Sequence, residues 1–260
     1  LLSLLELRIK GLEKLRNNLG DKNISYSNCN GYELFFGIDK LDRRIHKINE
    51  LLNPLIDKKV FSLRNKYIKR FGFAEEIVVG LTENKFEGSI DPGKMIFSLK
   101  KKLDSLGVDC YFSTEVESFE ETSKKIFLKL KSRNQSINIT SNKLAICTNA
   151  FAKKWFDVED ISPGRGIILM TNDLPELKVN SCFHYNEGYY YFRNVGRKLL
   201  IGGGREIDKN KETTFSFGIN KTIRQKLIND IQTFIIPNTD FNIECEWSGI
   251  MGFGKIKLPL

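Results

Sequence analysis

The residues between His184 and Glu206 bring together the side chains in this sequence that are most able to do chemistry. They include a histidine, three consecutive tyrosines, an arginine and three consecutive glycines, namely His184, Tyr189, Tyr190, Tyr191, Arg193, Gly202, Gly203 and Gly204. Three kinds of structure use such residues: a glycine loop that holds phosphate, a surface on which nucleic-acid bases stack, and adjacent strands of a sheet that face a ligand.

A phosphate-binding loop requires a strand, then spaced glycines, then a helix whose N-terminus faces the phosphate. The residues after Gly204 read REIDKNKETT, which is not the start of a helix. Three glycines that close a strand instead indicate the close approach of another backbone or of a flat ligand.

Alternation along a strand places Tyr189, Tyr191 and Arg193 on one face and Tyr190 and Phe192 on the other. Either both faces are buried, with the tyrosine hydroxyls bonded to neighbours, or one face lines a pocket. A nucleic-acid surface needs basic residues on the stacking face, and only one arginine qualifies, so we do not expect nucleic acid as a partner.

The remaining sequence contains little that resembles a hydrolytic or metal site. A nucleophile and base pair must use His184 or His46, and nothing places a nucleophile beside either; His46 lies among charged residues and is expected at the surface. The five cysteines are widely spaced and odd in number, which disfavours zinc and disulfides. We therefore expect reduced cysteines, no metal and a cytoplasmic protein.

Bulk composition predicts a folded protein without a membrane partner. The chain has 260 residues, 41% of them hydrophobic, and no apolar run approaches the roughly 18 residues that cross a bilayer. The formal net charge of +9 comes from dispersed lysines rather than from a basic stripe, so it does not by itself indicate an anionic partner.

Periodicity and turn signals predict a mixture of helices and strands. Helices are expected over residues 1–19, 38–55, 91–106 and 219–234, and a further one is expected to start near residue 152. The helix that Asp91 caps should bury Ile96, Leu99 and Leu103. Strands are expected over residues 108–112 and 143–151, in a three-stranded meander between them, and in five segments of the last hundred residues.

Several of these segments, in this order, resemble one known family. GSIDPGKMIFSLKKKLDSLGVDCYFSTEVESF, KLAICTNAF and the meander between them look like the central part of the D-amino acid oxidase and glycine oxidase family of flavoproteins. PGRGIILMT, FHYNEGYYYFRNVGRKLLIGGGRE and EWSGIMGFGKIKLP resemble the substrate-domain sheet of that family. The likeness extends over nearly the whole chain.

The resemblance implies an α/β (α+β) fold in which an incomplete Rossmann-like FAD-binding domain with a β-meander is interwoven with a substrate domain built on a mixed or antiparallel sheet. The expected divisions are a helix over 1–22 that continues a missing βαβ unit, substrate domain over 23–85, FAD-binding domain over 86–160 and substrate domain again over 161–260. The chain lacks the family's opening G-x-G-x-x-G and its closing glycine-rich segment, so we expect an internal fragment that does not retain FAD by itself.

The resemblance also implies a cofactor, a substrate class and site residues. FAD is expected to accept a hydride from the carbon beside an amine nitrogen of a small amine or amino acid. Expected cofactor-binding residues are Glu115, Val116, Glu117, Cys147, Thr148 and Asn149. Expected catalytic residues are Tyr189, Tyr191, His184, Arg193 and Met251.

One position departs from the family. Met251 occupies the region where the family carries an arginine that binds the substrate carboxylate, so Arg193, Arg205 or Lys255 are candidates to replace it. Two alternatives remain at this point: a truncated non-catalytic domain, and the oxidoreductase domain of a tRNA-modifying enzyme.

Overall fold

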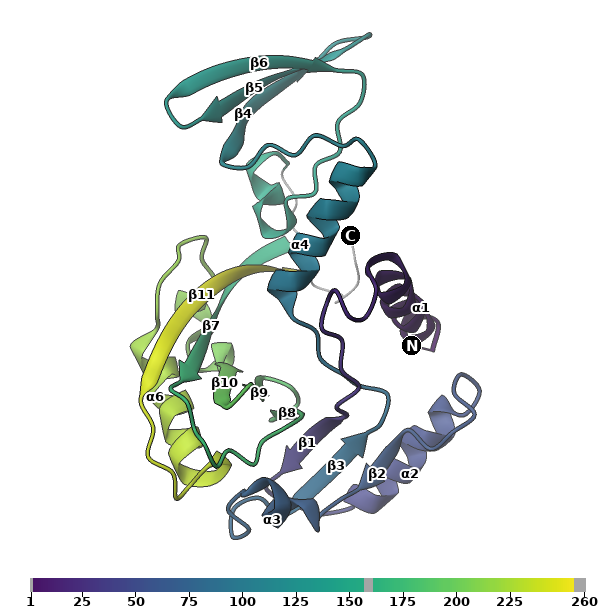
Figure 1. Ribbon diagram of the computed structural model, residues 1–260, viewed down its shortest axis with the longest axis vertical. Coiled ribbons are helices and arrows are strands. Elements are labelled where there is room, and N and C mark those ends of the chain that lie inside the picture. Colours follow the sequence, from purple (N-terminus) through teal and green to yellow (C-terminus); the bar gives the residue numbers. More distant parts are fainter. Residues whose placement is uncertain (1, 157–160, 255–260) are drawn as a thin grey trace.

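The computed structural model describes residues 2–156 and 161–254, and its strands form two sheets (Figure 1). The large sheet has eight strands in the order β11-β7-β10-β9-β8-β1-β3-β2, and the small one is a β4-β5-β6 meander. The strands are β1 (Gly31–Phe35), β2 (Phe61–Leu63), β3 (Gly80–Asn84), β4 (Thr114–Glu121), β5 (Ile126–Ser132), β6 (Gln135–Ser141), β7 (Ile161–Thr171), β8 (Cys182–Tyr185), β9 (Tyr190–Val195), β10 (Lys198–Gly203) and β11 (Ile243–Gly254).

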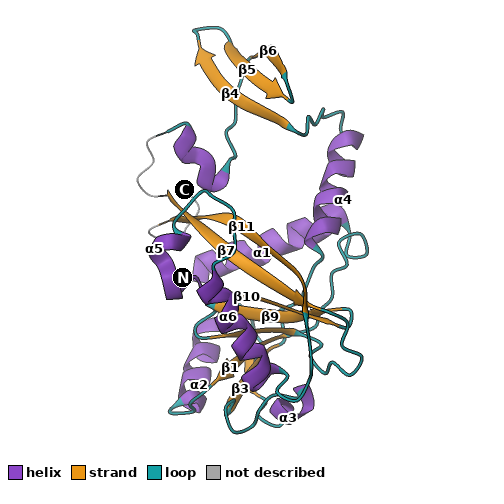
Figure 2. Ribbon diagram, turned by 90° about the vertical axis from the view of Figure 1, so that its left-hand side faces the viewer, coloured by secondary structure: helices purple, strands orange, loops and turns teal. Residues whose placement is uncertain are grey.

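The helices lie around the large sheet and between it and the meander, as the turned view shows (Figure 2). They are α1 (Leu2–Leu19), α2 (Leu41–Leu52), α3 (Tyr67–Phe71), α4 (Pro92–Ser105), the 3-10 helices η1 (Asn149–Lys154) and η2 (Arg205–Asp208), α5 (Lys209–Glu212), α6 (Lys221–Asp230) and the π-helical turn η3 (Ile231–Ile235). The α/β class with an eight-stranded mixed sheet and a separate meander confirms the fold expected from the sequence.

The large sheet is assembled from two parts of the chain that are far apart in sequence. Residues 31–84 supply β2, β3 and β1, and residues 161–254 supply the other five strands. The two parts meet where β1 pairs with β8 in parallel, with Gly31 opposite Cys182 and Leu34 opposite Tyr185. The other strand pairs described in this sheet are antiparallel.

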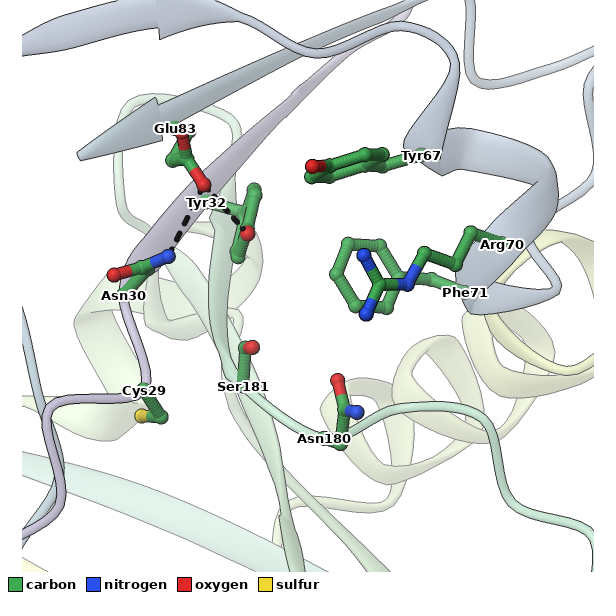
Figure 3. A pocket seen from close by; sticks show the side chains of 9 residues that line it. All are labelled: Cys29, Asn30, Tyr32, Tyr67, Arg70, Phe71, Glu83, Asn180 and Ser181. Atoms are coloured by element: carbon green, nitrogen blue, oxygen red, sulfur yellow. Dashed lines mark hydrogen bonds between the residues drawn. The ribbon is translucent and has the colours of Figure 1, made fainter. Parts of the chain in front are cut away.

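A buried carboxylate organises the end of the sheet formed by β1 and β3 (Figure 3). Glu83 is 4% exposed and accepts hydrogen bonds from Asn30 Nδ2 at 3.0 Å, Tyr32 Oη at 2.9 Å and Arg64 Nε at 2.9 Å. Three donors to one carboxylate offset its burial, because a buried charge is tolerated when it is paired and hydrogen-bonded.

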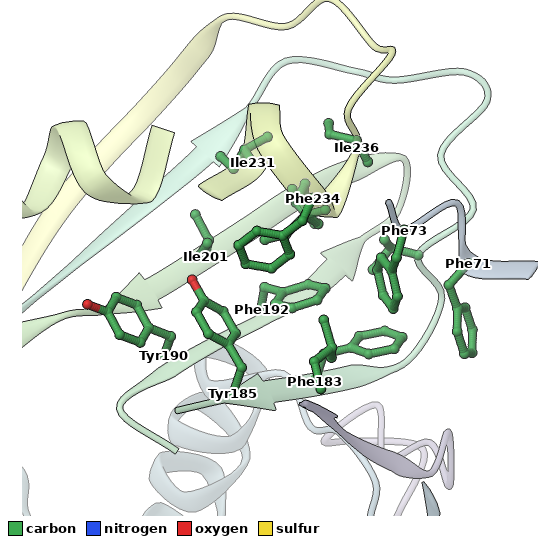
Figure 4. Close-up of a cluster of buried hydrophobic side chains, with 14 of the residues drawn as sticks. Phe71, Phe73, Phe183, Tyr185, Tyr190, Phe192, Ile201, Ile231, Phe234 and Ile236 are labelled. Atoms are coloured by element: carbon green, nitrogen blue, oxygen red, sulfur yellow. The ribbon is translucent and has the colours of Figure 1, made fainter. Parts of the chain in front are cut away.

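The main core lies on one face of the large sheet, beneath α6 and η3 (Figure 4). Tyr190 and Phe192 point into it from β9, and the Phe183 and Phe192 rings stack with their centroids 4.8 Å apart. Aromatic pairs of this kind add to the stabilisation that burial alone provides. The alternation expected for β9 is therefore confirmed, and it is one face that is buried rather than both.

Helix α4 starts and stops where the sequence predicted. The Asp91 side chain accepts a hydrogen bond of 3.0 Å from the Lys94 N–H, Pro92 is the first helical residue, and Gly107 follows in the left-handed region with φ of 73°. The expected burial of its apolar face is wrong: Ile96 is 58% exposed, Leu99 36% and Leu103 37%. Helix α1 and the loop that follows it contact α4, and they leave that apolar face exposed.

Two predicted strands are also wrong. Residues 108–112 and 143–148 run without a ladder partner in the described part of the chain, because no strand there lies beside them. The helix expected from residue 152 is the 3-10 helix η1, which begins earlier, at Asn149. The meander between these segments is confirmed, with turns at Ser123 and at Arg133–Asn134.

Candidate functional site

The face of the large sheet opposite the core carries a row of directly opposed residues from six strands. The pairings run from Glu33 to His184, from His184 to Tyr191, from Tyr191 to Gly202, from Gly202 to Ile168 and from Ile168 to Trp247. Directly opposed residues point to the same face of a sheet. The structure thus brings His184 and Tyr191 together, and it adds Trp247 to the same row, which we call the cross-strand row.

Aromatic side chains in the cross-strand row remain uncovered by the described chain. Tyr191 is 40% exposed and Trp247 is 42% exposed, although both lie within a sheet. Burial of the Tyr191 hydroxyl nonetheless raises its pKa. Large exposed aromatic groups that lie together on one face are typical of a ligand-binding or interaction surface.

At one end of the row, a carboxylate faces an imidazole. Glu33 Oε1 lies 4.0 Å from His184 Nδ1, and that nitrogen is buried without a hydrogen-bond partner among the described residues. Burial raises the pKa of Glu33, while the nearby His184 and Arg44 act in the opposite direction. A carboxyl group with a raised pKa beside a histidine is a candidate group for proton transfer.

The glycines of β10 accommodate protein atoms. A Cβ at Gly202 would lie 2.4 Å from Ile168 Cδ1 and 2.9 Å from Tyr191 Cε2, and one at Gly203 would lie 2.0 Å from the Tyr189 carbonyl oxygen. The close approach of another backbone, expected from the sequence, is confirmed at Gly203. At Gly202 the neighbouring side chains, rather than a ligand, fill the space, so Tyr191 can lie across the sheet.

The residues after the glycines are helical, contrary to the sequence prediction. Gly204 has φ of 77° and precedes η2, which leads directly into α5. Both helices are short, which explains why their polar sequence did not indicate them. Tyr189 lies before β9 in a turn, 51% exposed, and its carbonyl oxygen accepts the Gly204 N–H at 3.0 Å.

Arg193 lies on the same face, two residues from Tyr191, and is opposite Cys182 on β8. Its Nη1 donates a 3.0 Å hydrogen bond to the Ile90 carbonyl oxygen just before α4. The structure therefore gives this arginine a partner within the chain, at the point where the segment before α4 crosses the sheet.

The far end of β11 carries Met251 and Phe253 on the same face as Trp247. Met251 is opposite Gly164 of β7 and 42% exposed. The Arg205 guanidinium lies over the Phe253 ring, 4.0 Å from its centroid. Of the two candidate replacements within the described residues, Arg205 is the one that lies beside the Met251 region; Lys255 lies outside the described residues.

The expected adenosine-side residues Glu115, Val116 and Glu117 lie on β4, an edge strand of the meander. The register shifts between Val116 and Ser118, so Glu117 has no opposite residue on β5. The Glu115 carboxylate accepts a 2.5 Å hydrogen bond from Lys154, which lowers the pKa of Glu115. What this edge offers a ligand is therefore its unpaired backbone groups rather than a free carboxylate.

Cys147, Thr148 and Asn149 lead from the meander back to η1. Cys147 is exposed, and Asn149 has a left-handed backbone with φ of 50°. A Cβ added at Gly252 of β11 would lie 2.3 Å from Asn149 Oδ1. The turn at Asn149 therefore packs directly against the strand that carries Met251.

No helix among the described residues is both long and apolar enough to cross a bilayer. Within residues 2–156 and 161–254, no cluster of three or more His, Cys, Asp or Glu side chains is arranged to hold a metal ion.

The fold and the arrangement of its two sheets define a family. A sequence profile of the family described as FAD dependent oxidoreductase matches residues 2–259. The chain belongs to this family of FAD-dependent oxidoreductases, whose cofactor is FAD. The resemblance expected from the sequence is confirmed. No curated protein sequence matches the chain at a significant level.

Solved structures share the fold at low sequence identity. Glycine oxidase from Geobacillus kaustophilus superposes with a TM-score of 0.73 at 17% identity, covering 99% of this chain and 68% of that chain. Iminodiacetate oxidase from Chelativorans sp. BNC1 gives 0.76 at 14% identity, with coverage of 98% and 68%. L-proline dehydrogenase from P. horikoshii gives 0.71 at 16% identity, with coverage of 91% and 64%. The chain spans about two thirds of the length of these proteins.

The described residues fit FAD in two places. The first place is formed by the outer edge of β4 and by residues 143–148, which pair with no strand in the described chain. Their backbone N–H and C=O groups can form hydrogen bonds with a nucleotide. The cross-strand row presents exposed aromatic rings together with a partly exposed imidazole, which suits a flat ring system and a small substrate.

Sequence reasoning missed Glu33 and Ile168. Glu33 alternates with the buried Tyr32 and Leu34 in GYELF, so its face could have been predicted. Its position beside His184 depends on the parallel pairing of β1 with β8, and no local signal specifies that pairing.

Proposed function

We propose that this chain forms the substrate-facing part of an FAD-dependent oxidoreductase that oxidises a small amine or amino acid. The cross-strand row is the observation that carries this proposal, because it gathers an acid, an imidazole, a phenol and an indole on one uncovered face of the sheet. The solved proteins named glycine oxidase, iminodiacetate oxidase and L-proline dehydrogenase share this fold.

In the proposed arrangement, backbone groups of Glu115, Val116 and Glu117 hold the adenosine side of FAD, and Cys147, Thr148 and Asn149 lie along its middle. When bound, FAD takes up a hydride from the carbon beside the amine nitrogen. The protein residues bind and orient the substrate and control its protons.

On the sheet, Tyr191 and Trp247 provide the aromatic walls of the substrate pocket, with Tyr189 and Met251 at its rim. His184 faces the substrate with its second nitrogen, while its Nδ1 faces Glu33, whose raised pKa allows it to share a proton with the imidazole. Such a pair can take the proton that a substrate ammonium must lose before oxidation.

Arg205 is the proposed partner of a substrate carboxylate. Its guanidinium lies on the Phe253 ring beside the Met251 region, whereas Arg193 already donates to the Ile90 carbonyl. A planar guanidinium that stacks on a ring can still offer its edge to a carboxylate.

The test compares Tyr191→Phe with Tyr190→Phe in the full-length protein loaded with FAD, because the 260-residue chain is not expected to retain FAD by itself. The two residues are adjacent, but Tyr191 lies on the proposed site face and Tyr190 in the core. We expect Tyr191→Phe to lower kcat/KM by about tenfold while FAD content is unchanged, and Tyr190→Phe to leave kcat/KM near that of the wild type. Substrate-dependent bleaching of flavin absorbance, with glycine, L-proline and iminodiacetate as probes, measures turnover.

Three outcomes would contradict the proposal or part of it. Equal loss of FAD content and turnover in Tyr191→Phe would show a structural role for that residue. Bound FAD that none of the amine probes bleaches would favour a non-catalytic flavoprotein domain. Methylamine turned over as well as glycine would overturn the role of Arg205, because the two probes differ by the carboxylate.

A further inference from the structure

Two of the five cysteines are in direct contact. Cys29 Sγ and Cys182 Sγ lie 3.8 Å apart, although 153 positions separate them in sequence. Cys110, Cys147 and Cys245 lie in other parts of the fold, on the segment after α4, before η1 and on β11. All five are free thiols in the structure.

The backbone fixes this contact. Cys182 begins β8 opposite Gly31 of β1, and the chain before β1 turns at Asn30, whose φ is 62°. Cys29 lies just before that turn, where its N–H donates to the Ser27 carbonyl at 3.0 Å. Because a disulfide has a sulfur separation of about 2.05 Å, a side-chain rotation with a small backbone shift would bring the two sulfurs within bonding distance.

The two sulfurs have different acidities. The hydrogen bond with the Cys182 thiol is the largest influence on Cys29, and together with a hydrogen bond from Ser89 it lowers the pKa of Cys29 to about 6. The same contact and burial raise the pKa of Cys182. The charges of Arg193 and Glu87 act on Cys182 in opposite directions: Arg193 lowers its pKa and Glu87 raises it. Because the thiolate is the nucleophilic form, the lowered pKa of Cys29 leads us to assign the first attack to this residue.

Cys29 is partly exposed. It lines an open cavity of about 290 Å³ together with Asn30, Ser181 and Asn180, on the side of the sheet where α3 packs (Figure 3). The cavity is wide enough for a small polar molecule, and its walls near Cys29 are mostly polar. Cys182 has a similar degree of burial and is not among the residues that line this cavity.

We propose that Cys29 and Cys182 form a dithiol pair that a hydroperoxide converts to a disulfide. The Cys29 thiolate attacks one peroxide oxygen; an S–O bond forms, the O–O bond breaks, and the departing hydroxide takes up a proton as water. The Cys182 sulfur then attacks the sulfenic sulfur; an S–S bond forms, the S–O bond breaks, and the second hydroxide leaves as water with the Cys182 proton. Two thiols lose two electrons in total, and hydrogen peroxide is reduced to two waters.

The disulfide would close the place where the two parts of the large sheet meet. It would join the segment before β1 to the first residue of β8, at the end of the only parallel pair described in that sheet. A bond between such distant residues restricts the unfolded chain strongly, so oxidation is expected to raise Tm by about 5 °C or more.

The first experiment treats the reduced protein with one equivalent of hydrogen peroxide and counts thiols after denaturation. The expected result is a fall from five thiols to three, one disulfide-linked peptide pair containing Cys29 and Cys182, a higher Tm, and full reversal by dithiothreitol. Cys245→Ser serves as the matched control, since it removes an exposed cysteine and should leave the cross-link intact.

The second experiment identifies the attacking sulfur with dimedone, which traps sulfenic acid. In Cys182→Ser, dimedone should label Cys29, because its sulfenic acid can no longer be resolved. In Cys29→Ser, dimedone should not label Cys182. Equal labelling of Cys147 and Cys245, or a cross-link to either of them in the wild type, would overturn the proposal. Loss of two thiols in Cys29→Ser would overturn it as well.

Discussion

At the scale of single residues, the best-defined electrostatic feature outside the proposed site is a buried ion pair. Glu212 is fully buried and accepts hydrogen bonds from Arg165 Nε at 2.9 Å, Arg165 Nη2 at 2.8 Å and Asn220 Nδ2 at 2.9 Å. Burial raises the pKa of Glu212, but the hydrogen bonds from Arg165 and Asn220 outweigh it, and the pKa lies below its ordinary value. The pair links β7 to α5 and to the start of α6.

This arrangement predicts a pH-dependent stability. A carboxyl group with a lowered pKa in the folded state stabilises the fold above its ordinary pKa and loses that contribution as the pH falls through the folded value. At pH 7, Glu212→Gln should lower the free energy of unfolding by about 3 kcal/mol, because it leaves the Arg165 charge unpaired. Below pH 4 the difference from the wild type should shrink.

Urea unfolding at pH 7 and at pH 3.5 measures both values. Glu6→Gln is the matched control, because Glu6 forms an exposed pair with Lys10, and its removal should change stability by less than about 0.5 kcal/mol. A difference between Glu212→Gln and wild type that stays constant with pH would show that folding does not shift the pKa of Glu212.

At the scale of elements, the ends of α4 illustrate what local sequence specifies. Asp91 and Pro92 at its start and Gly107 after its end are signals whose physical effect does not depend on the rest of the molecule. The strands of the meander were predictable for a similar reason, since each pairs with its neighbour in sequence.

The cap of α4 leads to a quantitative expectation. Asp91→Ala removes the acceptor of the Lys94 N–H and should lower the free energy of unfolding by about 1 kcal/mol, whereas Asp91→Asn should lower it much less because the amide oxygen can still accept. Hydrogen exchange of the amides in the first turn of α4 localises the effect. Unchanged protection of these amides in Asp91→Ala would show that the cap does not hold the helix start.

The features that local sequence could not predict are those that depend on pairing with another strand. Residues 108–112 and 143–148 have apolar strand-like sequences, but a strand requires a neighbour, and the described chain supplies none. The same holds for the candidate site: the alternation of Tyr190 and Tyr191 predicted which side chains share a face, whereas Glu33 entered the site through its pairing with a strand some 150 positions away. The periodicity of a sequence predicts which side chains share one face of a strand, whereas the tertiary structure determines which strands lie next to each other.

At the scale of the whole molecule, the core of the large sheet and the α1–α4 pair differ sharply in burial. Leu227 of α6 is fully buried, whereas Leu99 and Leu103 of α4 and Leu12 of α1 are each more than a third exposed. Stability of the described fold therefore resides in the sheet and its α6 side. The apolar face of α1 and α4 contributes surface rather than core.

Lysine substitutions test this division in the 260-residue chain. Leu99→Lys and Leu103→Lys together should change Tm by less than about 3 °C and reduce binding of the dye ANS, because the new charges can remain in water. Leu227→Lys should lower Tm by far more, since it buries an unpaired charge. Unfolding of the double α4 variant would show that its apolar face packs in solution.

The parallel pairing of β1 with β8 also sets an order of events in time. Strands β1, β2 and β3 can pair with one another as soon as residue 84 has been synthesised, but β1 must wait for residue 182 before its other edge is covered. At typical rates of chain elongation, this delay is on the order of ten seconds. Closing so long a segment of chain is also entropically slow, which makes this pairing a late step of folding. During synthesis the nascent chain therefore presents one open edge of β1 to its surroundings, and that edge is where assembly of this fold is most exposed to misassociation.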